Sequence, residues 1–293
     1  MRSTFFLVLL LAVCLAQMAA DIYAPSLPAI ALSFDTTISH VQWSMSIYML
    51  GVAVSQLIYG PLSEGVGRKP PIVSGLIIMV IGSVICMTSS TIDTLIVGRL
   101  IQGLGAGACT CLWRSIFRDV FTGEDLARSS SYLNIFIIFI IPSAPLLGGY
   151  LQVLFNWRAN FVFMTGYTLV ALAGMIFIFK ETNQTYHVSK LKTDYIVKNY
   201  ALLLKNRFFM GLSLSTFLTY GAFFSWFVIG PVLLIEKIGI SPSTFGWLSF
   251  CGGAVACALA GYINGQLVKY LGMTFMMRVG WSIMILSGML MAL

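Results

Sequence analysis

Two ionisable residues lie deep inside long apolar stretches of the chain: Asp21 in the first stretch and Arg99 in the fourth. A charge at the centre of a bilayer costs at least about 2.5–3.5 kcal/mol, so each side chain should face a cavity or a partner. Counted at 1.5 Å per residue from Pro28 and from Asp93, the two lie at depths of about 10 Å and about 9 Å. This similar depth makes a shared polar site geometrically feasible.

The chemistry of such a pair is proton binding. Burial disfavours the ionised form of a carboxyl group and a nearby positive charge favours it, so a partly desolvated Asp21 can bind and release a proton. Arginine stays charged throughout, and Arg99 would act as the fixed counter-charge. A permanent structural ion pair, or an Asp21 hydrated near the interface, is the alternative. We favour proton or substrate handling.

The elements that must position this pair are membrane helices. Mean hydropathy is +0.91 and charged residues make up 9% of the chain, against roughly 25% in soluble domains. Each apolar span is near the roughly 20 residues that a helix needs to cross a bilayer. Nine spans are predicted: 4–32, 41–60, 71–90, 92–113, 131–154, 159–179, 208–235, 244–268 and 273–293. The fold class is therefore an all-α polytopic membrane protein.

Basic residues divide unequally between the two sides of these spans. With the N-terminus in the cytoplasm, the outer side holds Arg158 and Lys237. The inner side then holds Arg2, Arg68, Lys69, Arg114, Arg118, Arg128, Lys180, Lys190, Lys192, Lys198, Lys205, Arg207, Lys269 and Arg278. Lysine and arginine accumulate on the cytoplasmic side of membrane proteins. The net charge of +7 thus reports topology, and we expect no nucleic-acid partner.

The chain divides into an N-terminal six-helix half (1–180), a cytoplasmic linker (181–207) and a three-helix part of a second half (208–293). A faint repeat supports this division, because Gly60-Pro-Leu62 with Gly67 recurs as Gly265-Gln-Leu267 with Gly272. Duplicated halves are common in transporters. The linker carries an apolar face at Tyr195, Val197, Tyr200 and Leu204. It is either a helix on the anionic leaflet or a solvated segment with some helix.

Small residues predict where helices pack closely. Gly103 and Gly107 form a GxxxG pair in the fourth span, and a four-residue spacing joins Gly253, Cys257, Gly261 and Gly265 in the eighth. Such stripes let helix backbones approach each other in lipid. The six cysteines all fall inside spans, at spacings unlike those of a zinc site. No paired nucleophile or metal-ligand cluster is evident, so we expect neither an enzyme nor a metal or other cofactor.

Four motifs now carry a family resemblance over the whole chain. They are Asp21-Ile-Tyr-Ala-Pro-Ser-Leu-Pro28, Gly60-Pro-Leu-Ser-Glu-Gly-Val-Gly-Arg-Lys-Pro70, Arg99-Leu-Ile-Gln-Gly-Leu-Gly105 and Ala144-Pro-Leu-Leu-Gly-Gly149. The sequence resembles the major facilitator superfamily, and most closely its drug:proton antiporter branch, the bicyclomycin and chloramphenicol resistance exporters. It departs from the family pattern at Glu64, where Asp is usual, and at Ala144, where Gly is usual.

The resemblance implies a role for each motif. Asp21 would be the proton site that competes with substrate, with Arg99 as its electrostatic partner. Gly60, Glu64, Gly67 and Arg68 would form a cytoplasmic latch that stabilises the outward-facing state. Pro145, Gly148 and Gly149 would shape a close helix contact that limits proton leak. The simpler alternatives are that Arg68 only sets topology and that Gly148 and Gly149 are ordinary packing glycines.

The resemblance also implies a function. The expected activity is proton-coupled antiport that exports drugs or other small amphipathic molecules across the bacterial inner membrane, by a monomer in the lipid bilayer. Candidate substrate-lining residues are Tyr23, Gln102, Tyr220, Phe223 and Trp226. Export of a small metabolite such as an amino acid is the alternative within transport. A transport-inactive membrane protein is another, because the family has twelve helices and about nine are predicted here.

Overall fold

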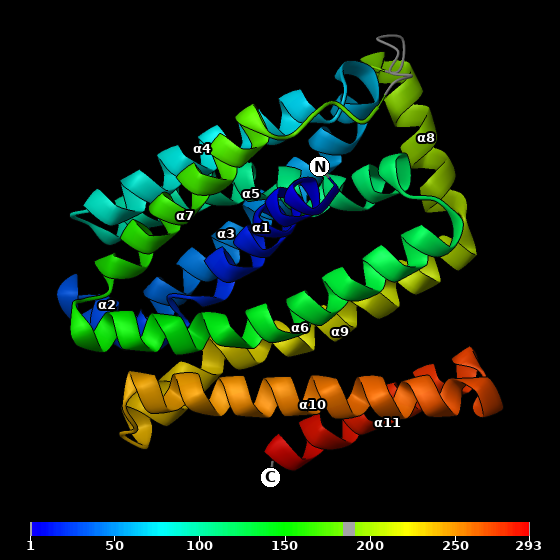
Figure 1. Ribbon diagram of the computed structural model, residues 1–293. Coiled ribbons are helices and arrows are strands. Elements are labelled where there is room, and N and C mark those ends of the chain that lie inside the picture. The colour runs from blue at the N-terminus through cyan, green and yellow to red at the C-terminus, as the bar shows by residue number, and fades with distance from the viewer. Residues whose placement is uncertain (1, 184–190, 293) are drawn as a thin grey trace.

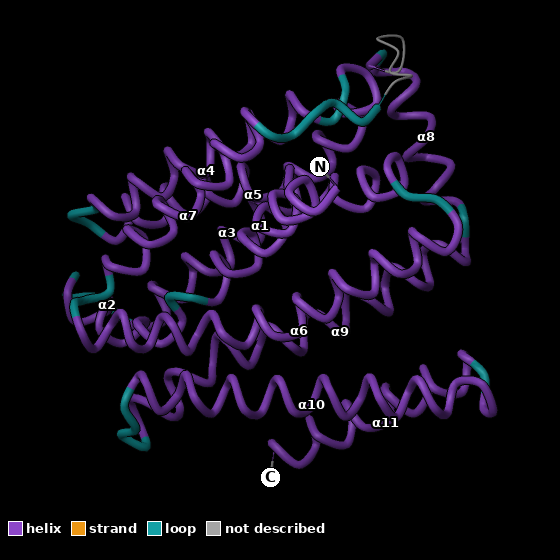
Figure 2. The backbone as a smooth tube through the Cα atoms, viewed as in Figure 1, coloured by secondary structure: helices purple, strands orange, loops and turns teal. Residues whose placement is uncertain are grey.

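The computed structural model describes residues 2–183 and 191–292 of the chain, and every regular element in that part is helical (Figures 1 and 2). The first group of helices comprises α1 (Arg2–Asp21), the short η1 (Ala24–Ser26), α2 (Leu27–Ser33), α3 (Ile38–Val66), α4 (Lys69–Thr88), α5 (Ile92–Val120), α6 (Gly123–Leu154) and α7 (Arg158–Phe177). The linker helix α8 (Thr193–Lys205) follows. The second group comprises α9 (Arg207–Pro231), the π-helical η3 (Val232–Lys237), α10 (Pro242–Leu271) and α11 (Met273–Ala292).

Seven helical segments among the described residues are long and apolar enough to cross a membrane. They are Phe5–Ser33, Ile38–Val66, Lys69–Thr88, Ile92–Val120, Arg158–Phe177, Arg207–Lys237 and Pro242–Val268. The predicted span 131–154 falls within α6, and the described part of the predicted span 273–293 coincides with α11; both are long helices, and residue 293 lies outside the described residues. The predicted all-α class is confirmed.

The long helices run up and down between two ends of one bundle (Figure 1). One end, the latch end, contains the latch segment (residues 60–70) and the linker helix α8; the opposite end, the far end, contains α2. Three helices that begin at the far end are capped by a hydroxyl: Thr37, Thr91 and Ser241 each accept a hydrogen bond from a backbone N–H three residues on. Such caps satisfy donors that have no partner within the helix.

The predicted internal repeat reappears in the backbone at the latch end. Gly67 follows α3 with a φ of 95° and Gly272 follows α10 with a φ of 76°. A positive φ is readily accessible to glycine, which has no Cβ. The two copies of the motif therefore end their helices in the same way, with a left-handed glycine before the next helix.

The glycine pair predicted on the fourth span does bring helices together. A Cβ on Gly103 would overlap the carbonyl of Tyr48, and one on Gly107 would overlap the side chain of Ser55, so α5 lies directly against α3. The stripe on the eighth span behaves differently. A Cβ on Gly253 would contact Pro142 of α6, but one on Gly261 would meet nothing within 4 Å.

The packing interpretation of this second stripe is thus wrong for Gly261 and Gly265, which both face open space. No helix in the described part of the chain covers that section of α10, so its smooth face has no neighbour.

The two groups of helices meet mainly through α6 and α10, and at the far end through contacts of η1 and α2 with the second group. Gln42 of α3 donates its side-chain N–H to the carbonyl of Val228 in α9 at 2.9 Å. The indole N–H of Trp247 in α10 donates to the hydroxyl of Tyr150 in α6, also at 2.9 Å.

Candidate functional site

Asp21 is the last residue of α1, at a break in the first membrane-spanning segment. Pro25 has no N–H, so the Asp21 carbonyl loses the backbone donor that would continue the helix. A proline also disfavours helical geometry at the residue that precedes it. The chain continues through η1 into α2, which brings Pro28 into its first turn. Non-helical backbone at membrane depth is tolerated where protein surrounds it, and Asp21 and Tyr23 are fully buried.

Arg99 of α5 occupies the space beside this break. Its Nη1 donates to the carbonyl of Ala19 at 2.9 Å and to the side-chain oxygen of Gln102. Its guanidinium lies over the rings of Tyr23 and Tyr48, with 4.3 Å and 4.0 Å to the ring centroids. Arg99 is almost completely buried, and stacking on aromatic faces compensates part of the cost of that burial.

Hydroxyl and amide groups extend this cluster outward from Arg99. Gln102 donates to the hydroxyl of Ser83 at 2.7 Å, and the hydroxyls of Tyr23 and Ser44 are 3.0 Å apart. The Tyr48 hydroxyl donates to the carbonyl of Ala16 at 2.6 Å. The result ties α1, α3, α4 and α5 together through polar groups inside an apolar bundle.

Asp21 and Arg99 share this buried region without forming an ion pair. Among the described residues, neither carboxylate oxygen of Asp21 has a hydrogen-bond partner, and Nε and Nη2 of Arg99 have none either. The side chain of Gln17, one turn before Asp21, and the guanidinium of Arg99 are polar neighbours of the carboxylate. The alternative of a permanent salt bridge is therefore not the arrangement seen here.

A cavity of about 640 Å³ approaches this cluster from the latch end. Gln17 and Tyr48 form its inner wall, and Trp113 and Arg114 of α5 lie nearer the latch end. The second group contributes Tyr220 to the cavity wall, together with Thr216, Phe217 and Phe224. The sequence did not identify Tyr48. Gln17 could have been identified, because it is a polar residue four positions before Asp21 and therefore lies on the same helix face.

The remaining candidate lining residues lie elsewhere. Tyr23 and Gln102 are fully buried in the Arg99 cluster and line neither this cavity nor the next. Phe223 and Trp226 line a separate apolar cavity of about 330 Å³ between α6, α9 and α10. Of the five candidates, Tyr220 alone borders the large cavity next to Gln17 and Tyr48.

The motif on α6 contacts both the helix break and the second group. A Cβ on Gly148 would overlap the carbonyl of Ile22, the residue after Asp21, and one on Gly149 would overlap the carbonyl of Pro242 at the start of α10. Gly246 of α10 lies in turn against the carbonyl of Pro145. These glycines permit backbone contact that any side chain would prevent.

The latch segment forms a compact group of charges at its own end of the bundle. Arg68 pairs with Glu64 at 2.7 Å and with Asp119, near the end of α5, at 2.9 Å. Its Nη1 also donates to Ser63. Partial burial acts to lower the pKa of Arg68, but the bonds from Asp119 and Glu64 outweigh it and raise that pKa. Gly60 borders a cavity under α8.

Glu181, just beyond α7, extends this charge group by capping α4. Its carboxylate accepts backbone N–H bonds from Arg68 at 2.7 Å and Lys69 at 3.0 Å, and from Thr182 and Asn183. Burial acts to raise the pKa of this carboxyl, but the four N–H groups outweigh it and hold the pKa below its usual range. A Cβ on Gly67 would overlap the Glu181 carboxylate. The sequence motif did not identify Asp119 or Glu181, because both are distant in the chain.

The chemistry of the site is therefore that of a buried acid, a buried arginine and a partly aromatic cavity. Among the described residues no group of three His, Cys, Asp or Glu side chains could hold a metal ion.

Comparison with known sequences agrees with this architecture. The model of the Major Facilitator Superfamily matches residues 9–293. The bicyclomycin resistance protein homolog of Haemophilus influenzae is 28% identical over 98% of this chain, and the multidrug resistance protein MdtL of Klebsiella pneumoniae is 31% identical over 77%. Multidrug resistance protein D of Escherichia coli is 37% identical over 58%. The chain spans 73%, 57% and 42% of the length of these relatives, in that order.

Solved structures show the same fold. A bacterial homolog of the human lysosomal transporter Spinster, in an inward-facing and unoccupied conformation, aligns with a TM-score of 0.71 at 18% identity. The match covers 92% of this chain and 63% of that one. A D-xylose-proton symporter aligns with a TM-score of 0.66 at 14% identity, over 92% of this chain and 70% of that one. The chain belongs to the major facilitator superfamily, a family of membrane transporters rather than enzymes.

Proposed function

We propose that this transporter is a proton-coupled antiporter that exports small amphipathic organic molecules across the bacterial inner membrane. The observation that carries the proposal is Asp21: a fully buried acid that has no hydrogen-bond partner among the described residues, at a helix break, beside the buried Arg99. A cavity walled by Trp113, Phe217 and Tyr220 ends at Gln17 and Tyr48, next to this buried cluster. Apolar pockets with a few convergent polar groups are typical of small-molecule sites. Drug-resistance relatives support the substrate class.

The proposed cycle makes proton and substrate compete for one carboxylate. With the proton bound, Asp21 is neutral and the positive charge of Arg99 is uncompensated, which disfavours a cationic substrate nearby. With the proton lost, the cavity gains a negative charge and favours an amphipathic cation. The binding of either partner then biases the transporter toward release of the other, because coupling between two ligands is reciprocal.

The proposed orientation places the latch end and the N-terminus in the cytoplasm. Among the described residues, the latch end holds the arginines and lysines of the latch segment and the linker, while Arg158 and Lys237 lie at the far end. Two groups joined at the far end by Gln42–Val228 and by the Gly149 contact with Pro242 then correspond to an inward-facing state. In this state the ion pairs of Arg68 with Glu64 and Asp119, and its backbone bond to Glu181, stay within the first group and the segment after it.

Proton release on ligand binding tests this proposal without requiring net transport. Tetraphenylphosphonium, a lipophilic cation, is added to the purified chain in lipid nanodiscs in a weakly buffered solution. We expect about one proton to be released for each bound cation, since one embedded carboxylate takes part. The Asp21→Asn variant should release none, whereas Asp93→Asn, which alters an exposed acid at the far end, should behave as the parent. Equal release from Asp21→Asn would overturn the assignment.

A further inference from the structure

The linker after α7 lies on the latch end of α3 at three successive points. Asn183 donates its side-chain N–H to the carbonyl of Ser63 at 3.4 Å. Leu191 fills the space over Gly65, where any Cβ would overlap its side chain. The hydroxyl of Tyr200 donates to the carbonyl of Leu57 at 2.9 Å. Only part of the predicted apolar face, at Tyr195 and Tyr200, turns toward the bundle; Val197 and Leu204 are exposed.

The third point coincides with a defect in α3. In an α-helix the carbonyl of residue 57 accepts a bond from the N–H of residue 61, and here residue 61 is a proline inside the helix. Pro61 has no N–H, and its ring pushes against the carbonyl four residues earlier. The Leu57 carbonyl is thus left without its backbone donor and turned outward, and it is this carbonyl that Tyr200 reaches.

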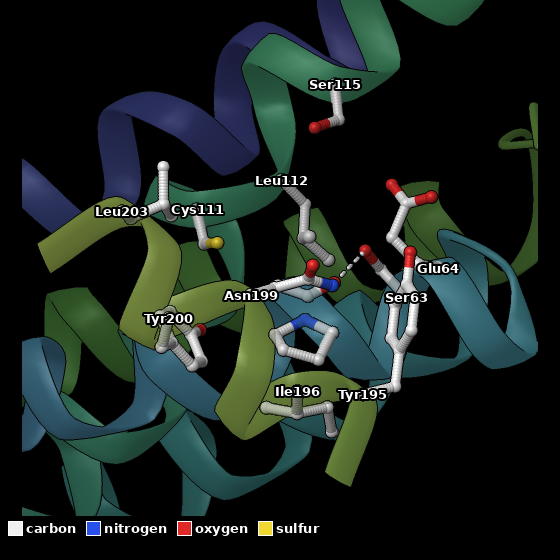
Figure 3. Close-up of a pocket in the computed structure, with 12 residues that line it drawn as sticks. Ser63, Glu64, Cys111, Leu112, Ser115, Tyr195, Ile196, Asn199, Tyr200 and Leu203 are labelled. Atoms are coloured by element: carbon white, nitrogen blue, oxygen red, sulfur yellow. Dashed lines mark hydrogen bonds between the residues drawn. The ribbon is translucent and has the colours of Figure 1, made fainter. Parts of the chain in front are cut away.

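We propose that Tyr200 is a positioning residue that substitutes for the backbone donor removed by Pro61, and thereby fixes the linker helix to the latch segment. Tyr200 and Pro61 both border a cavity of about 390 Å³ between α3, α5 and α8. Figure 3 shows Tyr200 and Leu203 of α8 among the residues that line this cavity, with Cys111 and Leu112 of α5 drawn near Leu203.

A fixed α8 makes Asn206 the joint between the two groups of helices. Lys205 ends α8 and Arg207 begins α9, so one residue separates them. The side chain of Asn206 accepts the N–H groups of Phe208 and Phe209 and caps α9. This step rests on the proposed transport function: if the second group rocks against the first, the motion turns at Asn206 while α8 stays with the latch segment.

Hydrogen exchange of the α8 amides measures the fixation directly. Four proteins are compared in nanodiscs: the parent, Y200F, P61A and the double variant. Y200F keeps the ring and loses the donor, and should speed exchange of the α8 amides about threefold to tenfold, as expected for one net hydrogen bond. In P61A the N–H of the new residue takes the Leu57 carbonyl, so adding Y200F should change exchange by less than about twofold.

Tyr195→Phe is the matched control, because Tyr195 lies on the same helix and borders the same cavity but has no hydroxyl partner among the described residues. It should leave exchange unchanged. An equal effect of Y200F with and without Pro61, or an equal effect of the two tyrosine variants, would overturn the proposal. The measurement is made on the resting protein, so a failed proton-release experiment would count against the transport function and leave this result standing.

Discussion

The helices before the linker and those after it are built from similar residues but meet very different surroundings. In the most apolar 18-residue windows of Phe5–Ser33 and Ile92–Val120, 72% and 61% of residues are buried. The corresponding shares for Arg207–Lys237 and Pro242–Val268 are 17% and 12%. The first group also holds the buried Asp21 and Arg99, while the second contributes an aromatic wall to the cavity and contacts at the far end.

The comparison shows that a small-residue stripe marks a helix face and does not specify its partner. Both α5 and α10 carry glycines at four-residue spacing, but α5 is central to its group, whereas α10 packs mainly against α6 and leaves Gly261 and Gly265 in open space. In lipid, close backbone contact provides the packing energy. The polar cluster around Arg99 can exist in the first group because packing there is dense enough to hold each member.

The largest effect should come from filling a packed glycine and leaving an open one. Gly103→Ala pushes a methyl group into the Tyr48 carbonyl. We expect the free energy of unfolding to fall by about 3 kcal/mol, which is at the upper end for overpacking. Gly261→Ala, in open space, should change stability by less than about 1 kcal/mol. Thermal unfolding in the same detergent compares them. Similar losses would show that the face of α10 is packed in the membrane after all.

Replacing Arg99 tests whether the chemistry belongs to the first group. Arg99→Lys keeps the charge but loses the planar fork that stacks on Tyr23 and Tyr48 and donates to Ala19. Removing these contacts should lower the affinity for tetraphenylphosphonium, measured from the concentration that releases half of the protons, at least about tenfold, which is equivalent to about 1.4 kcal/mol. The exposed Arg118→Lys is the control. Parent-like release from Arg99→Lys would reduce Arg99 to a packing or topology residue.

The contact between groups at the far end should be weaker. Gln42→Leu removes the donor to the Val228 carbonyl, and one net hydrogen bond is worth about 1 kcal/mol. We expect a several-fold larger population with the far end open. Distance distributions between spin labels on residues 33 and 237 report that population. An unchanged distribution would mean that the α6–α10 glycine contacts alone hold the groups together.

The smallest effect concerns Glu181 at the latch end. Its pKa is lowered in the fold, so its stabilising contribution is present above the unfolded pKa of about 4.3 and is lost as pH falls through the lower folded value. Glu181→Gln should cost about 0.5–1 kcal/mol at pH 7, because an exposed cap is partly screened. The difference in stability between the parent and the variant should shrink as pH falls below about 4.3. A difference of the same size at pH 7 and at pH 3 would contradict this account.

Much of the fold was predictable, because helix length and hydropathy report directly on membrane crossing. Asp21 and Arg99 were also found from sequence, since a charge in an apolar span stands out. The sequence could not reveal that their side chains form no ion pair, nor that Tyr48 separates them from the cavity. Those facts depend on rotamers and on helices distant in the chain. Pro25 and Pro28 encode the break after Asp21, although the hydropathy of residues 4–32 alone predicts a single helix.

The cap on α4 has a consequence for how the protein is made. The helix begins at Lys69, but the carboxylate that satisfies its first N–H groups belongs to a residue 112 positions later. At a synthesis rate of about 5–20 residues per second, roughly ten seconds pass before the ribosome supplies it. During that time the turn between α3 and α4 has no Glu181 to close on. The step that completes the first group is therefore the arrival of the segment after α7, rather than the insertion of any one helix.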